Sequence, residues 1–249
     1  MFVEDIFIAR RTNPEKPLML LLHGAGGQHL QWMGVARMLD EAAIIAPDLP
    51  GHGRSSGTGE ETIGSYAAHI LRLMDHLDID RALIGGHSMG GAIALALALH
   101  HSDRVAGLVL ASTGARLKVG QPVFDALEAG VQPFVDLFAS MAYGPQTDPD
   151  LIARGRDLLA EAGRDVIQRD FEACHAFDVR EHIAQIMVPA LVLCGSADRM
   201  TPPHYAESLA AAIPGARLHL IDGAGHMLPV EQPDETAAHI NAWLHGLTG

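Results

Sequence analysis

The chain has 249 residues, 48% of them hydrophobic, which fits one α/β domain or two small ones with a sizeable buried core. Its net charge of −13, with only 17 lysines and arginines, argues against binding to nucleic acid or to an anionic membrane surface, because both require a cationic patch. The acidic amino-terminal segment lacks the apolar core of a signal peptide and no apolar run is long enough to span a bilayer, so we expect a cytoplasmic protein.

Apolar segments of strand length alternate with helical stretches along most of the chain. Strands are expected at residues 2–9, 17–22, 42–46, 81–85, 105–111, 190–194 and 217–221. Helices are expected at residues 30–39, 63–77, 89–100, 205–213 and 234–247. Because most of these strands are continuously apolar, the pattern predicts a mostly parallel sheet with helices on both of its faces.

Residues 114–186 interrupt this alternation, since they have helical periodicity without a strand and are cut by several glycines and prolines. We therefore divide the chain into a core of residues 1–113 and 187–249 and a helical cap of residues 114–186. The cap holds five of the seven phenylalanines, namely Phe124, Phe134, Phe138, Phe171 and Phe177. These rings would either form the cap's own hydrophobic core or line an apolar pocket beneath it, and the sequence leaves both interpretations open.

A glycine-flanked serine follows the strand at residues 81–85, in the segment Gly86-His87-Ser88-Met89-Gly90. The pattern G-x-S-x-G between a strand and a helix is typical of a tight turn that lifts a serine hydroxyl out of the end of a sheet. The backbone of such a turn is strained, and the glycines at positions 86 and 90 remove side chains that would collide there. We therefore predict that Ser88 is a nucleophile at the positive end of the following helix.

A serine nucleophile needs a general base and an acidic partner that orients the base. His226 lies in a glycine-rich turn directly after the strand at 217–221, and Asp198 follows the strand at 190–194. Both residues therefore fall at the carboxyl edge of the predicted sheet, where the sites of open α/β sheets lie. Asp222 is a rival acid, but its place on the same turn as His226 favours Asp198.

A carbonyl oxygen that becomes negatively charged needs two backbone N–H donors beside the serine. Met89, the residue after the nucleophile, is expected to supply one, and the glycine-rich segment at residues 23–27 is expected to supply the other. Such a loop is also typical of dinucleotide sites, but the spacing G-x-G-x-x-G is absent and Asp48 heads a loop rich in proline and glycine. We therefore expect no nucleotide cofactor.

The fifteen histidines raise the question of a metal site, but no H-E-x-x-H motif and no clustered Cys/His spacing is present, so we expect neither a metal nor another cofactor. Cys174 and Cys194 are the only cysteines. Cys194 falls in an apolar strand and is expected to be a buried thiol, and nothing in the sequence supports a disulfide between the two.

Five segments together resemble the α/β-hydrolase family, in the family's order, and they span the chain apart from the cap. They are His23-Gly24-Ala25-Gly26-Gly27 with Trp32 downstream, Ala46-Pro47-Asp48-Leu49-Pro50-Gly51-His52-Gly53-Arg54-Ser55, Gly86-His87-Ser88-Met89-Gly90-Gly91, Gly195-Ser196-Ala197-Asp198, and Gly223-Ala224-Gly225-His226. The resemblance implies an α/β-hydrolase fold with a mostly parallel central sheet, helices on both faces and a helical cap insertion.

The resemblance also implies roles for single residues. His226 would be the base that activates Ser88, with Asp198 as its partner. The backbone N–H groups of Ala25 and Met89 would form the oxyanion hole. The segment around His52 and Asp48 matches a structural loop of the family and receives no catalytic role, and His87 is expected to pack rather than to react.

The activity implied by the resemblance is hydrolysis of a small, mostly apolar carboxylic ester or lactone through an acyl-enzyme on Ser88. Residues 173–180, running into residues 188–190, are similar to the cap exit of enol-lactone hydrolases and small carboxylesterases. Serine at position 88 excludes family members whose nucleophile is aspartate. Three alternatives stay open: a hydrolase of carbon–carbon bonds in ring-cleavage products, a hydroxynitrile lyase, and a ligand-binding or signalling member with little turnover.

The partner is expected to be a small-molecule ester or lactone, with no nucleic acid and no membrane. Residues 115–185 carry seven basic and twelve acidic side chains. Because the cap is net negative, it would repel an acidic acyl carrier protein, and we do not expect such a partner. The oligomeric state is unknown from the sequence.

Overall fold

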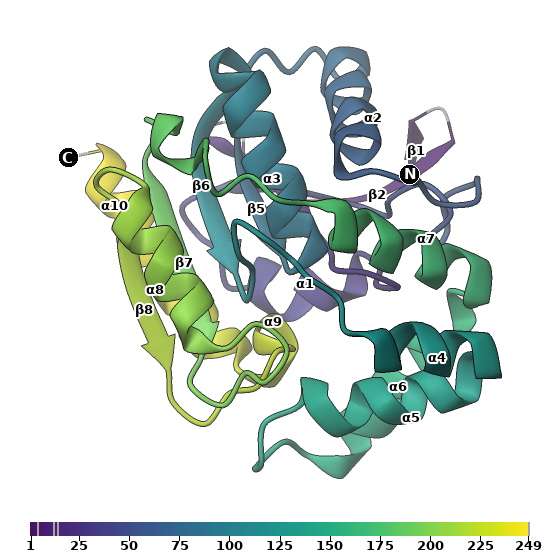
Figure 1. Cartoon of the computed structure of the whole chain (residues 1–249). Coiled ribbons are helices and arrows are strands. Elements are labelled where there is room, and N and C mark those ends of the chain that lie inside the picture. Colours follow the sequence, from purple (N-terminus) through teal and green to yellow (C-terminus); the bar gives the residue numbers. More distant parts are fainter. Residues whose placement is uncertain (4, 12, 14, 249) are drawn as a thin grey trace.

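The structure, a computed structural model, describes all residues of the chain except 4, 12, 14 and 249. Its strands are β1 (Phe2–Val3), β2 (Ile6–Arg11), β3 (Leu18–Leu22), β4 (Ala43–Pro47), β5 (Ala82–His87), β6 (Val105–Ala111), β7 (Ala190–Gly195) and β8 (Arg217–Ile221). Among the described residues these strands form one sheet in the order β1-β2-β4-β3-β5-β6-β7-β8 (Figure 1). The two amino-terminal strands run antiparallel to their neighbours, and all pairs from β4 to β8 are parallel.

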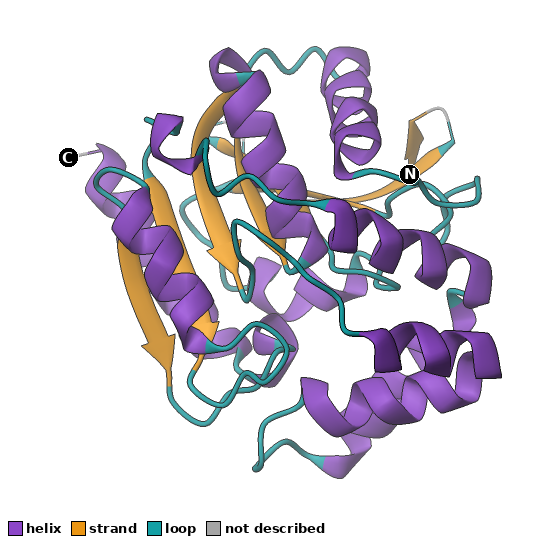
Figure 2. Cartoon of the chain, viewed as in Figure 1, coloured by secondary structure: helices purple, strands orange, loops and turns teal. Residues whose placement is uncertain are grey.

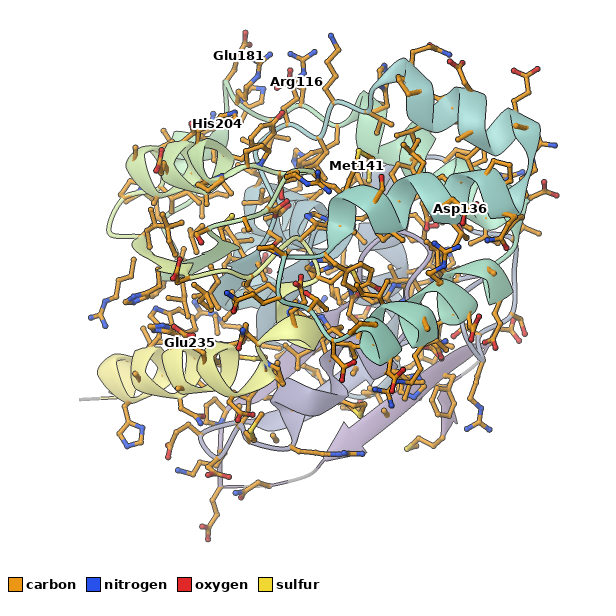
Figure 3. All side chains as sticks on the ribbon, turned by 90° about the horizontal axis from the view of Figure 1, so that it is seen from below. Arg116, Asp136, Met141, Glu181, His204 and Glu235 are labelled. Atoms are coloured by element: carbon orange, nitrogen blue, oxygen red, sulfur yellow. The ribbon has the colours of Figure 1, made fainter. Side chains whose placement is uncertain are left out.

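Helices cover both faces of the sheet (Figure 2). They are α1 (Leu30–Ala36), α2 (Ile63–His76), α3 (Met89–His100), α8 (Pro203–Ala212), α9 (Leu228–Glu231) and α10 (Pro233–Thr248). In Figure 3, which shows the molecule from below, α8 with His204 and α10 with Glu235 lie on opposite sides of the sheet. The predicted α/β architecture with a mostly parallel sheet is therefore confirmed.

The alternating side chains of each buried strand build two separate hydrophobic layers. Leu20 and Leu22 of β3 belong to the layer under α2, α3 and α8, whereas Met19 and Leu21 belong to the layer under α1 and α10. All four side chains are fully buried, and burial of a side chain of this size contributes about 1.5–3 kcal/mol. Helix α3 is apolar on all sides because it is buried on all sides.

Four helices lie between β6 and β7 in the chain: α4 (Gln121–Ala129), α5 (Val131–Ala142), α6 (Pro149–Glu161) and α7 (Arg164–Ala176). Figure 1 places α4, α5 and α6 beyond the carboxyl ends of the parallel strands. The phenylalanines of this segment support both interpretations. Phe134 is buried in the segment's own core, and Phe124 packs against that core. Phe138 and Phe171 contribute to the same core and also line the pocket described below, whereas Phe177 is buried in the core beneath α3.

Three local expectations were wrong in detail. The strand expected at residues 2–9 is divided into two antiparallel strands, paired at Val3 and Ile6, and the sequence between them has no Gly, Pro or Asn to reveal the division. The helix expected at residues 30–39 ends at Ala36, and the next two residues, Arg37 and Met38, form a turn. Helix α9 was not expected, since four residues that include a proline are too short to show periodicity.

Within the described part of the chain, no helix is long and apolar enough to cross a bilayer. In that same part, no three His, Cys, Asp or Glu side chains come together in a way that could hold a metal ion. Cys174 and Cys194 are both buried free thiols, and burial raises the pKa of Cys174 above its usual value.

Candidate active site

Ser88 occupies a strained turn between β5 and α3. Its backbone has φ 52° and ψ −114°, a left-handed conformation that costs of order 1–3 kcal/mol for a residue other than glycine. A Cβ atom on Gly86 would lie 2.1 Å from the carbonyl oxygen of Gly90, and one on Gly90 would lie 2.3 Å from that of Leu22. The two glycines therefore let the strand, the serine and the helix pack closely enough to form the turn.

The structure brings the side chains of Ser88, His226 and Asp198 into one hydrogen-bonded row. His226 Nε2 lies 3.0 Å from Ser88 Oγ, and His226 Nδ1 lies 3.0 Å from Asp198 Oδ2. The histidine and the aspartate are buried, whereas the serine is half-buried at the wall of a pocket. The rival acid Asp222 is exposed and accepts a hydrogen bond from the Ser196 hydroxyl instead.

Asp198 is held in its ionised form by several donors. Its Oδ1 accepts hydrogen bonds of 2.9 Å from the backbone N–H groups of Met200 and Thr201, and its Oδ2 accepts one of 2.8 Å from the Thr201 hydroxyl. Burial works to raise the pKa of Asp198, but the charge and hydrogen bond of His226 and the bonds from Thr201 outweigh it and lower the pKa to about 2. The carboxylate therefore stays charged at any working pH and can stabilise a protonated His226.

The end of α5 and the residues after it hold the turn that carries His226. The backbone N–H groups of His226 and Met227 donate to the carbonyl oxygen of Ala142, at 2.7 and 3.1 Å. Glu231 adds a second link, because its Oε2 accepts from the backbone N–H groups of both Gly144 and Gly225. The histidine turn is therefore packed against the helical insertion rather than free in solvent.

His87 connects the loop after β3 to the turn that carries His226 through a chain of hydrogen bonds. The Gly24 N–H donates to Gln31 Oε1 at 2.9 Å, Gln31 Nε2 lies 2.9 Å from His87 Nδ1, and His87 Nε2 lies 2.7 Å from the His226 carbonyl oxygen. Burial, together with repulsion from His226, lowers the pKa of His87 to about 3, so the ring is neutral. A neutral ring with Nδ1 as acceptor and Nε2 as donor satisfies both contacts. His87 thus links two loops of the site by hydrogen bonds, beyond the packing role expected of it.

Met89 follows Ser88 in the chain, and Ala25 lines the same cavity as Ser88. Gly24 runs so close to the serine that a Cβ atom on it would lie 3.3 Å from Ser88 Cβ. Among the residues that the structure describes, neither the Ala25 N–H nor the Met89 N–H has a hydrogen-bond partner. Met89 opens α3, so its N–H group also lies at the positive end of the helix dipole.

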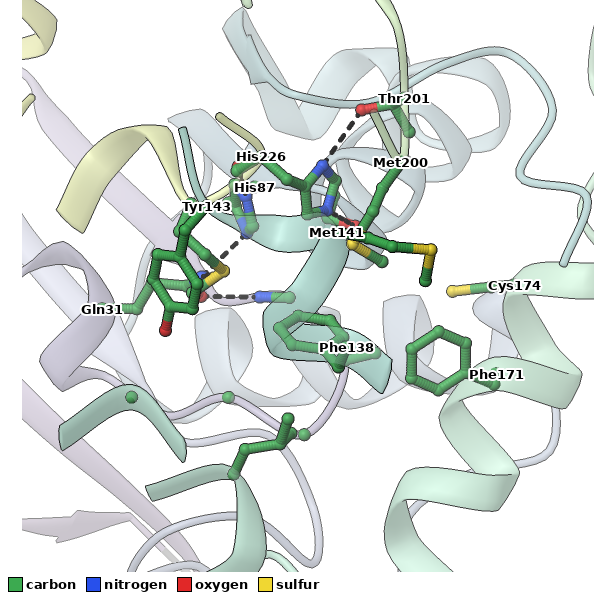
Figure 4. Close-up of a pocket in the computed structure, with 18 of the residues that line it drawn as sticks. Gln31, His87, Phe138, Met141, Tyr143, Phe171, Cys174, Met200, Thr201 and His226 are labelled. Atoms are coloured by element: carbon green, nitrogen blue, oxygen red, sulfur yellow. Dashed lines mark hydrogen bonds between the residues drawn. The ribbon is translucent and has the colours of Figure 1, made fainter. Parts of the chain in front are cut away.

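A cavity of about 470 Å³ opens in front of Ser88 and His226, a size that suits a small organic molecule. Phe138, Met141, Phe171 and Met200 lie around this space beside His226 (Figure 4). The lining comes mainly from the helical insertion and from the loops after β3 and β7, and it is mostly apolar.

The charged residues that line the cavity are all cationic. They are Lys118, Arg154 and Arg199, and among the described residues no aspartate or glutamate lines it, although the chain carries 30 acidic residues. All three cationic side chains are exposed, which places them at the rim. The cavity therefore combines apolar walls with a positively charged entrance in an otherwise acidic protein.

Comparison with known proteins identifies the family of this chain. The sequence profile described as "Alpha/beta hydrolase family" matches residues 19–239. The chain belongs to the alpha/beta hydrolase family. The match covers the strands and loops that carry Ser88, Asp198 and His226, and the resemblance stated above is therefore confirmed at the level of the family and its fold.

Among individual relatives, 3-oxoadipate enol-lactonase 2 of Acinetobacter baylyi is 28% identical, with 88% of this chain and 85% of that protein covered. The crystal structure of the enol-lactonase from Burkholderia xenovorans LB400 is similar with a TM-score of 0.90 and 27% identity, covering 96% of both chains. A thermophilic esterase from Thermogutta terrifontis has a TM-score of 0.88 and 27% identity, covering 98% of this chain and 94% of that one. This hydrolase is thus similar to lactonases and esterases.

Sequence reasoning missed several side chains that hold the site, among them Gln31 and Thr201. Thr201 lies three residues after Asp198, and a hydroxyl at this spacing can bond the carboxylate within one turn, so a local signal existed. Gln31 had no such signal, because its partner His87 is 56 residues away in the sequence.

Proposed function

We propose that this alpha/beta hydrolase is a serine hydrolase that cleaves a small carboxylic ester or lactone through an acyl-enzyme on Ser88. The observation that carries the proposal is the unbroken row from Ser88 Oγ through both ring nitrogens of His226 to Asp198. A serine alone is a weak nucleophile, and this row supplies the base and the charge that activate it.

In the first half-reaction Ser88 Oγ attacks the carbonyl carbon while His226 Nε2 takes the hydroxyl proton. The electron pair of the carbonyl bond moves to the oxygen, which the N–H groups of Ala25 and Met89 stabilise. When the tetrahedral intermediate collapses, the ester C–O bond breaks and His226 returns the proton to the leaving alcohol. Asp198 stays ionised and stabilises the imidazolium that exists between the two proton transfers.

In the second half-reaction water replaces the alcohol. His226 takes a proton from the water molecule, the hydroxide attacks the acyl carbon, and the bond to Ser88 Oγ breaks with return of the proton to the serine. The product is a carboxylic acid. With a lactone the leaving alcohol stays tethered to the acyl group, so a single hydroxy acid is released.

We assign residues 114–186 the role of a cap that shapes the substrate pocket over a core of residues 1–113 and 187–249. Phe138 and Phe171 support this assignment, because both line the cavity in front of Ser88. The mostly apolar lining fits a small apolar acyl or alcohol group. The likeness to enol-lactonases and an esterase supports the same substrate class.

The test is hydrolysis of p-nitrophenyl acetate and butyrate by the Ser88→Ala variant, with Ser65→Ala on the exposed end of α2 as the matched control. We expect Ser88→Ala to lose roughly 10³-fold or more in rate and the control to match the wild type. Undiminished hydrolysis by Ser88→Ala would refute the proposal. A vinylogous diketone assayed beside the esters separates ester hydrolysis from the carbon–carbon alternative, since preferential cleavage of the diketone would favour the latter.

A further inference from the structure

Asp170 on α7 is a fully buried carboxylate that the reaction described above does not use. It accepts three hydrogen bonds, all from residues distant in the sequence. The Gly26 N–H and His52 Nε2 donate to its Oδ2 at 2.7 Å each, and the Tyr66 hydroxyl donates to its Oδ1 at 2.5 Å. A buried carboxylate with this many donors is held in one orientation.

The pairing with His52 shows the charge state of this cluster. His52 Nε2 faces the Asp170 carboxylate, and His52 Nδ1 lies 3.0 Å from the carbonyl oxygen of Pro50, so both ring nitrogens face acceptors. Both can donate only when the imidazole is protonated. Burial works to lower the pKa of His52, but the charge and hydrogen bond of Asp170 outweigh it and raise the pKa. The protonated ring of His52 thus lies against the buried Asp170 side chain beneath the loop of residues 24–27.

The backbone N–H groups of that loop have distinct partners. Gly24 N donates to Gln31, Gly26 N to Asp170, and Gly27 N to the Gly24 carbonyl oxygen. Among the described residues only the Ala25 N–H in this loop is left without a partner, and Ala25 lines the cavity. The loop is therefore fixed at three of its four N–H groups, which leaves the fourth free for a substrate oxygen.

Gly26 also lies tightly against the helical insertion. Its φ is +63°, and a Cβ atom on it would lie 2.5 Å from Leu159 Cδ1 of α6. Two contacts therefore fix the orientation of the peptide bond between Ala25 and Gly26. Gly26 packs against α6, and its N–H donates a hydrogen bond to Asp170 of α7.

We propose that Asp170 is a positioning residue that holds the Gly26 N–H and thereby aims the Ala25 N–H at the oxyanion formed on the substrate. The inference rests on the proposed function, because it assumes that a carbonyl is attacked by Ser88. It also means that the insertion helices complete the oxyanion hole rather than only enclosing the substrate. Loss of the Asp170 contact then weakens binding of the transition state more than binding of the ester.

The experiment compares Asp170→Ala with Glu172→Ala, a control that removes an exposed carboxylate from the same helix. Two readouts are measured: kcat and KM, each determined separately with p-nitrophenyl butyrate, and the affinity of a trifluoromethyl ketone. The ketone forms a hemiketal with a serine, and its negative oxygen would occupy the oxyanion hole. The matching non-fluorinated methyl ketone, bound without the adduct, reports ordinary affinity.

We expect Asp170→Ala to lower kcat by roughly 10²-fold, close to the loss of one oxyanion-hole donor, with KM changed less than about threefold. The affinity of the trifluoromethyl ketone should fall by the same factor, whereas the affinity of the methyl ketone and the kinetics of Glu172→Ala should stay near wild type. A folded Asp170→Ala variant with kcat and ketone affinity within threefold of wild type would overturn the inference.

Asp170→Asn provides a second variant in case the alanine variant does not fold. Asparagine can still accept from the Gly26 N–H but without charge, so we expect an intermediate loss in kcat of about fivefold. A change smaller than twofold would then contradict the inference. If Ser88→Ala keeps its activity, the proposed function itself fails; if Ser88→Ala is inactive and the Asp170 variants are normal, only this inference fails.

Discussion

Replacement of His87 by glutamine should make the protein less sensitive to acid. The ring is buried between Gln31 and the His226 carbonyl oxygen, and burial lowers the pKa of His87 from its usual value of 6.5 to about 3. Below pH 6.5 His87 is therefore protonated in the unfolded chain, whereas it stays neutral in the folded protein until the pH approaches 3. The stability that comes from a neutral His87 is complete above pH 6.5 and is lost as the pH falls toward 3.

The size of the effect follows from the two pKa values. With 6.5 for the unfolded chain and about 3 for the folded protein, lowering the pH from 7 to 5 removes about 2 kcal/mol of unfolding free energy through this residue. His23 adds a similar loss, because burial and the charge of His52 lower its pKa to about 4. Removing His87 should therefore flatten the pH dependence without abolishing it.

The assay is urea unfolding at pH 7, 6 and 5 for the wild type, His87→Gln and the exposed control His204→Gln. Glutamine keeps one donor and one acceptor but has no group that titrates in this range. We expect the loss of stability between pH 7 and 5 to shrink by about 2 kcal/mol in His87→Gln and to be unchanged in the control. An equally steep loss in His87→Gln would refute the assignment of a neutral buried ring at this position.

Three further outcomes follow from single contacts. Thr201→Val removes the hydroxyl that donates to Asp198 and should lower kcat/KM about tenfold, measured with p-nitrophenyl butyrate; an unchanged value would show that the bond has no role. Gly90→Ala places a Cβ 2.3 Å from the Leu22 carbonyl oxygen and should cost at least about 3 kcal/mol in urea unfolding, so wild-type stability would contradict the packing of the turn. Arg154→Gln should raise KM about threefold for a mono-p-nitrophenyl ester of a dicarboxylic acid, which is anionic, but not for a neutral ester. Equal changes in KM for both esters would exclude selection of anionic substrates by the cationic entrance of the cavity.

The positions of Ser88, Asp198 and His226 could be anticipated because each depends on local pattern. Ser88 directly follows β5, and Asp198 and His226 lie in the loops that begin at the ends of β7 and β8. The carboxyl ends of parallel strands meet at one edge of a sheet. The order of the strands places those ends side by side, so three short motifs far apart in the sequence converge without any detail of side-chain packing.

The residues that hold the loops could not be anticipated, because their partners are set by tertiary packing. Asp170 lies 144 residues from Gly26 in the sequence, within a helix that carries other acidic residues of similar appearance. Glu231 and Gln31 likewise bond groups on other elements. The same limit applies to the division between β1 and β2, where the sequence has Asp5 but no glycine or proline beside it.

Labelling with a serine-reactive phosphonate tests the central claim most directly. The reagent forms a covalent bond to an activated serine and loses its leaving group, so peptide mass spectrometry identifies the residue that attacked. We predict one phosphonyl group per chain, on the peptide that contains Ser88, formed at the same rate at which esterase activity is lost. Complete loss of activity with the label on another residue, or full activity with Ser88 labelled, would contradict the account.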